Sequence, residues 1–171
     1  MGNEPFQVRD KLIVINKMSL RLAPMEAHLS MPKNDEYYCS RLYVWGDDLD
    51  PKRVTEMLGI EPDRTYRRGD RKFRLNSDGK LEPMNFVYPR GLWRRAIDEG
   101  KQSWDVAAQL EYWCGLLGSR GVALNELRQQ GYEIEIDCYI ECGPVALMNL
   151  PASLVQKLGM LGIGLSFGFY D

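Results

Sequence analysis

The segment of residues 132–142 constrains the fold most, because apolar and polar side chains alternate along it without a break. Successive side chains of a β-strand point to opposite faces, so Ile134, Ile136 and Ile140 would share one face. The other face would carry Tyr139 and a row of four carboxylates, Glu133, Glu135, Asp137 and Glu141. The pattern predicts a strand with one face on a hydrophobic core and the other in water.

A second strand and a short helix are predicted upstream. Residues 41–45 alternate and are rich in β-formers, which favours a strand. Asp50 offers an N-cap carboxylate, Pro51 suits the first helical position, and Gly59 suits the left-handed residue after a helix. We therefore expect a helix over residues 51–58.

The remaining elements are read from periodicity and from turn residues. Apolar residues recur at helical spacing over residues 106–127, with Ser103 as a candidate N-cap, and Gly118 and Gly121 predict a break between two helices. Gly131 would end the second of these helices. Turn chemistry at residues 76–79 predicts a hairpin or a long loop. We further expect short strands near residues 72–75, 85–88 and 91–94, a helix at about 151–158, and a closing strand over 163–169 with its larger side chains toward the core.

These elements predict one α+β domain over residues 38–171, after an N-terminal extension, residues 1–37, with one possible edge strand. A chain of 171 residues with 44% hydrophobic and 27% charged residues can form one such core. Pro51 and Pro151 begin similar segments, which is either generic helix punctuation or a sign of two βαβ-like halves. Both interpretations predict a ferredoxin-like sandwich with a mostly antiparallel sheet and helices on one face.

Composition excludes several classes of function. A net charge of −2 recruits neither nucleic acid nor membrane over the whole surface, and we expect no membrane span. Four cysteines without a CxxC pair, behind no secretory segment, predict reduced, mostly buried thiols in the cytoplasm and no metal site. His28 is the single histidine, and no nucleophile, phosphate-loop or dinucleotide motif occurs. We expect no cofactor and no catalytic residues.

The polar face of the two clear strands is the first candidate site. If Leu42 and Val44 face the core, then Arg41, Tyr43 and Trp45 lie on the wet face with Tyr139 and the acidic row. Exposed aromatic residues beside acids are typical of a recognition surface. The acids could instead be neutralised across strands, or could serve a metal-dependent or carboxylate-based hydrolase. The predicted partner-binding residues are Arg41, Tyr43, Trp45, Glu133, Glu135, Asp137, Tyr139 and Glu141.

A basic segment with two aromatic residues, Tyr66 and Phe73, is the second candidate. Such a segment could bind phosphates or single-stranded bases. Its arginines could equally pair with the acidic row, or with Asp47 and Asp48. The alternative phosphate-binding residues are Arg64, Arg67, Arg68, Arg71, Lys72 and Arg74.

Several runs resemble a bacterial family of small α+β domains of unknown function, over about residues 38–171. The runs are the strand at 41–46, the helix start Asp48-Leu49-Asp50-Pro51, the exit Leu58-Gly59-Ile60-Glu61-Pro62, Arg67-Arg68-Gly69, Gly91-Leu92-Trp93 and the ending from Leu158-Gly159 to Tyr170-Asp171. The resemblance transfers no catalytic residue.

Some members of that family look like immunity proteins encoded beside secreted toxins. The resemblance therefore implies a non-catalytic binding protein that occludes the functional surface of a cognate toxin, with a basic toxin domain as partner. The alternatives from the residues are a nucleic-acid-binding accessory domain and a hydrolase on the acidic row.

Overall fold

The computed structural model describes residues 37–102, 104–141 and 148–170. The chain divides into two compact units, Met1–Pro32 and Lys33–Asp171, and every described residue belongs to the second. Most of the predicted extension, with its candidate strand and His28, lies outside the described residues, as does Cys142.

The described residues form a main sheet of five strands in the order β2-β5-β1-β6-β7. Strand β1 lies at the centre and runs antiparallel to both β5 and β6, whereas β6 and β7 are parallel. The prediction of an α+β fold with a mostly antiparallel sheet is confirmed. The strands are β1 (Tyr37–Gly46), β2 (Arg64–Tyr66), β5 (Gly91–Ala96), β6 (Glu133–Glu141) and β7 (Gly164–Tyr170).

The two segments that begin at Pro51 and Pro151 lead to different strand pairings. The first helix is followed, after further strands, by β5, which lies antiparallel to β1. The second connects β6 to β7, a parallel neighbour, as a βαβ unit does. The two segments are therefore not equivalent βαβ-like halves. The layering, with a mostly antiparallel sheet and helices on one face, agrees with the expected ferredoxin-like sandwich.

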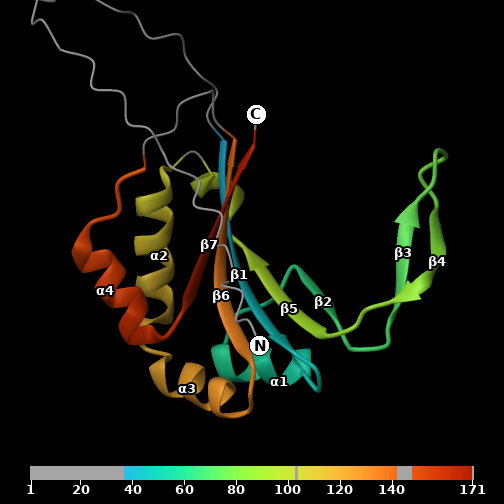
Figure 1. Cartoon of the computed structure of the whole chain (residues 1–171), viewed down its shortest axis with the longest axis horizontal. Helices are drawn as coiled ribbons and strands as arrows, with labels where there is room; N and C mark the ends of the chain where they lie inside the picture. The colour runs from blue at the N-terminus through green and yellow to red at the C-terminus, as the bar shows by residue number, and fades with distance from the viewer. Residues whose placement is uncertain (1–36, 103, 142–147, 171) are drawn as a thin grey trace, which may run out of the picture. The chain divides into compact units, whose positions relative to one another are not determined.

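The helices are α1 (Pro51–Leu58), α2 (Val106–Gly118), α3 (Gly121–Gln129) and α4 (Ala152–Leu161), with a short 3-10 turn at Glu99–Lys101. Figure 1 shows α2 and α4 along one face of the sheet. The predicted α1 is confirmed with both caps, because the Asp50 carboxylate accepts from the Lys52 amide and Gly59 has a φ of 60°. The expectation that Ser103 caps α2 is corrected: the cap is Asp105, whose carboxylate accepts a 2.7 Å hydrogen bond from the Ala108 amide. None of the described helices is long and apolar enough to span a membrane.

The hydrophobic core lies between these helices and the sheet. Leu42 and Val44 of β1 and Ile136 of β6 are fully buried, as the alternation predicts. Trp93 and Trp113 are the largest side chains in this core. The indole N–H of Trp93 donates to Thr55 Oγ1 over 3.0 Å, so the core also fixes α1 against β5.

Two arginines donate hydrogen bonds to backbone carbonyls at the ends of helices. Arg120 donates to the backbone carbonyls of Leu58 and Leu116, in the last turns of α1 and α2. Arg128 donates over 2.7 Å to the carbonyl of Leu161, the last residue of α4. A cation at the carbonyl end of a helix opposes the negative pole of the helix dipole. These hydrogen bonds therefore connect the segment around α3 to the carboxyl ends of α1, α2 and α4.

A separate two-stranded hairpin, the arm, consists of β3 (Arg71–Leu75) and β4 (Leu81–Val87). The predicted turn at 76–79 is confirmed, with Gly79 at a φ of 74°. In Figure 1 the arm lies on the side of the sheet opposite α2 and α4. Strand β2 and the first half of β4 were not expected from the sequence.

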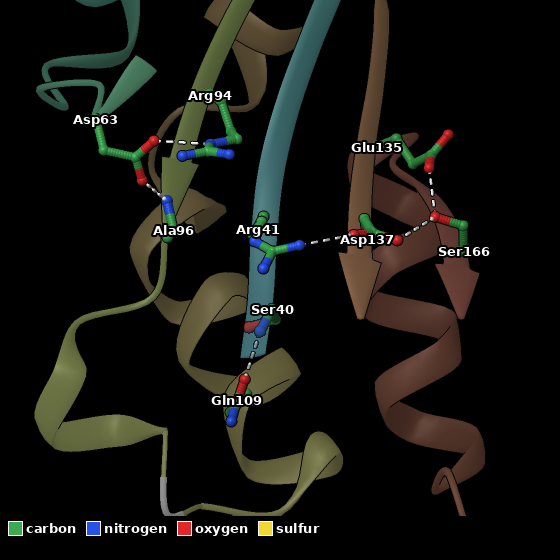
Figure 2. Close-up of polar contacts among 9 residues, drawn as sticks. All are labelled: Ser40, Arg41, Asp63, Arg94, Ala96, Gln109, Glu135, Asp137 and Ser166. Carbon is green, nitrogen blue, oxygen red and sulfur yellow. Dashed lines mark hydrogen bonds and ion pairs between the residues drawn. The ribbon is translucent and has the colours of Figure 1, made fainter. Parts of the chain in front are cut away.

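One buried polar group holds the start of β1. Gln109 is 1% exposed; its Oε1 accepts a 2.9 Å hydrogen bond from the Ser40 amide, and its Nε2 donates to the carbonyls of Tyr38 and Trp104. Figure 2 shows Gln109 rising from α2 toward Ser40. The Trp113 indole donates to Ser40 Oγ over 2.8 Å, so the amide and the hydroxyl of the buried Ser40 both have partners. These bonds tie helix α2 to one register of the central strand.

Replacing this amide tests its role. Gln109→Ala removes the hydrogen-bond partner of the Ser40 amide and of the Trp104 carbonyl, so we expect a loss of about 2–3 kcal/mol in the free energy of unfolding by urea. Gln130→Ala, which removes an exposed amide just after α3, is the control and should change the free energy of unfolding by less than about 0.5 kcal/mol. Equal unfolding midpoints for the two variants would contradict the proposed role of Gln109 in holding the start of β1.

The three described cysteines provide a second test. Cys39, Cys114 and Cys138 are free and buried, as predicted. Burial, with a smaller effect of Asp137, raises the pKa of Cys138 to about 12, so about one molecule in 10⁴ carries its thiolate at pH 8. In a Cys142→Ser variant, we expect a thiol reagent to label Cys138 only after urea unfolding. Labelling of the folded chain at the rate of a free peptide thiol would contradict this burial.

Candidate functional site: the open face of the sheet

The sheet face opposite the helices, here called the open face, is defined by the strand registers. Tyr43 of β1 lies between Arg94 of β5 and Glu135 of β6, and Arg41 lies between Ala96 and Asp137. The open face comprises Tyr37, Cys39, Arg41, Tyr43, Trp45, Arg64, Tyr66, Leu92, Arg94, Ala96, Glu133, Glu135, Asp137, Tyr139, Glu141, Gly164, Ser166, Gly168 and Tyr170. All eight predicted partner-binding residues are therefore brought together on one surface.

Aromatic rings pack against one another across this face. Tyr43 and Trp45 are stacked with ring centroids 5.1 Å apart. Tyr139 stacks on Tyr170 of β7 at 4.4 Å and meets Tyr37 edge to face at 6.1 Å. These contacts hold large rings in fixed orientations without burying them in the core. A fixed ring loses little conformational entropy when a partner covers it.

The acidic row is largely paired within the sheet. Arg90 donates to Glu133 over 2.9 Å and lowers the pKa of that carboxyl. Arg41 lies 3.6 Å from Asp137, with the Tyr139 ring 5.7 Å from its guanidinium carbon. Glu141 is exposed, and its side chain has no hydrogen bond or ion pair within the described part of the chain. The row is thus less negative toward a partner than its sequence indicates.

Ser166 of β7 links two of the acids, as Figure 2 shows. Its hydroxyl is in hydrogen-bond contact with Glu135 Oε1 and lies 3.2 Å from Asp137 Oδ1. The sequence could not reveal this contact, since it depends on the pairing of β6 with β7. No group of three His, Cys, Asp or Glu side chains suited to a metal ion occurs among the described residues.

The opposite half of the open face is basic. Arg94 donates to the Asp63 carboxylate over 2.7 Å, and the same carboxylate accepts from the Ala96 amide (Figure 2). Arg64 lies beside Arg94 in the register and over the Tyr66 ring. Charge therefore changes across the sheet, from arginines on β2 and β5 to carboxylates on β6.

The basic segment runs from β2 into the arm and is not a free cationic loop. Arg67 donates to Asp50 over 2.6 Å, which lowers the pKa of that carboxyl, and Arg68 lies 3.5 Å from Asp47. Tyr66 and Tyr88 stack at 3.5 Å, with Lys72 over the second ring. The expected pairing of these arginines with Asp47 is seen, while Asp50 takes the place foreseen for Asp48. The predicted phosphate-binding residues divide between β2 (Arg64), the turn (Arg67, Arg68) and the arm (Arg71, Lys72, Arg74).

Sequence reasoning missed the apolar surface of the arm. Phe73 pairs with Pro83 and Leu75 with Leu81, while Arg74 and Glu82 alternate with them. Five large apolar side chains of the arm are more than half exposed: Phe73, Leu75, Leu81, Phe86 and Val87. The alternation of apolar residues on both sides of the 76–79 turn is the signal that could have identified them.

Known proteins give this chain a family but no activity. No curated protein and no solved structure matches it. The model of one family, described as a domain of unknown function (DUF4279), matches residues 35–171, which include every strand and helix described above. The chain belongs to this family.

Proposed function

We propose that the chain is a non-catalytic binding protein whose open face holds a protein partner, as an immunity protein covers the functional surface of a toxin. The observation that carries the proposal is the pairing of β1 with β6. It sets Tyr43, Trp45 and Tyr139 among charged groups on a sheet face that the described helices leave uncovered. Tyrosine, tryptophan and arginine are the residues that most often dominate binding energy at protein interfaces.

The arm supports a protein as the partner. Its exposed phenylalanine, leucine and valine side chains form an apolar surface on a two-stranded hairpin, which is marginally stable in isolation. Clustered exposed apolar side chains typically mark interaction sites. Aliphatic groups such as Leu75 and Leu81 suit an apolar protein surface better than they suit phosphates.

The charge distribution specifies the partner further. A toxin surface that is basic opposite β6 and acidic opposite Arg64 of β2 would complement the open face. Glu141 is the acid best placed to attract a basic toxin domain, because no described cation neutralises it. Such a protein acts in the cytoplasm, where it protects the cell that makes it.

Nucleic-acid binding and hydrolysis receive less support from the described residues. A phosphate at Arg67 or Arg68 would have to displace Asp50 or Asp47. Two carboxylates of the row, Glu135 and Asp137, already share the Ser166 hydroxyl. We therefore develop the protein-binding proposal alone.

A growth assay tests the proposal. Each protein encoded next to the gene for this chain is expressed in a bacterial host, alone and together with the chain. We expect one neighbour to stop growth and the chain to restore it.

The double variant Tyr43→Ala, Trp45→Ala should raise the dissociation constant of the purified complex by about 10²-fold or more, because central aromatic residues each contribute roughly 2 kcal/mol or more.

Matched charge variants separate the open face from the rest of the surface. Glu141→Lys should slow association severalfold at low salt, whereas Glu56→Lys on α1, also exposed, should leave the rate unchanged. Circular dichroism confirms that each variant is folded. If no neighbour is toxic, or if the aromatic double variant protects as well as the parent chain, the proposal is wrong.

A further inference from the structure

The two edges of the main sheet are built differently. Strand β2 has three residues, includes Arg64, and is held to β5 by the Asp63 carboxylate. Short length and charge are devices that prevent an edge strand from pairing with another chain. Strand β7, at the other edge, has seven residues and contains neither a charged residue nor proline.

The outer side of β7 is unpaired within the described part of the chain. Its inner side pairs with β6 from Gly164 to Tyr170, and no described residue hydrogen-bonds to its outer backbone groups. Phe169 and Tyr170 are each about half exposed, at 54% and 51%. A long, apolar, unprotected edge is a template for pairing with a further strand.

We infer that β7 pairs antiparallel with β7 of a second copy, through a two-fold axis at Phe167. In this register Leu165 lies opposite Phe169, and Ser166 lies opposite Gly168. Gly164 lies opposite Tyr170, so each large ring of the open face meets a residue without a side chain. Antiparallel pairing of identical strands repeats every contact twice, as a two-fold dimer requires.

The composition of β7 favours a second copy over a different partner. Self-pairing places identical strands side by side, and like charges opposite each other would oppose it. Strand β7 carries no charge, and its pattern of alternating glycine and aromatic residues is complementary to itself when reversed. The pairing preserves side-chain alternation, so the open faces of both copies lie on the same side of one continuous sheet.

Sedimentation analysis of the full chain tests this dimer without any partner protein. Over about 1 to 100 μM we expect a species of twice the 19.7 kDa chain mass. Phe169→Lys puts a charge on an exposed edge position twice per dimer and should raise the dissociation constant about tenfold or more. Val122→Lys on α3, where the valine is 86% exposed, is the matched control and should leave the dimer intact.

Hydrogen exchange provides a second measurement that does not depend on a variant. Amides of residues 164–170 should exchange more slowly as the chain concentration rises, while those of β2 should not change. A monomer at all concentrations, or a dimer unaffected by Phe169→Lys, would overturn the inference. Because neither measurement involves a toxin, the dimer can fail while the proposed function stands, and the reverse also holds.

Discussion

The rest of the structure depends on the hydrogen bonds between the buried Gln109 amide and the start of β1. A slip of β1 by one residue would turn its apolar side chains outward and move Ser40 away from both Gln109 and Trp113. The buried amide would then lose its partners, which costs more than an exposed hydrogen bond contributes. One polar contact in the helix layer thus selects which residues of the central strand face solvent.

That selection has consequences on both sides of the sheet. On the helix side, Leu42 and Val44 complete the core with Ile136. On the open side, the same register sets Arg41 beside Asp137 and Tyr43 beside Glu135. The core and the candidate interface are therefore two results of one strand pairing, and a variant that disturbs the pairing would disturb both.

Local patterns predicted the elements better than their connections. The alternation of β6 and the caps Asp50 and Gly59 depend on neighbours in sequence, so both were identified correctly. Strand β2 spans only Arg64–Tyr66, too short for a period to show, and Pro83 hid the first half of β4, since proline fits only edge strands. The N-cap of α2 was assigned to Ser103, whereas Asp105, two residues later, caps the helix. The face of the candidate site could be predicted, but its ion pairs could not, because most of them join residues far apart in sequence. The turn of the arm was predicted, whereas the exposure of its apolar side chains was missed.

Oxidative footprinting of the isolated full chain by hydroxyl radicals tests the central claim, that the sheet has one covered and one open face. Trp93 and Trp113 are at most 1% exposed, and Trp104, at 40%, provides an internal reference. The account predicts that Tyr43 and Trp45 are oxidised at rates approaching that of Trp104, while Trp93 and Trp113 are protected until the chain unfolds. If Tyr43 and Trp45 were protected as strongly as Trp93, the face would be covered and could not be the recognition surface.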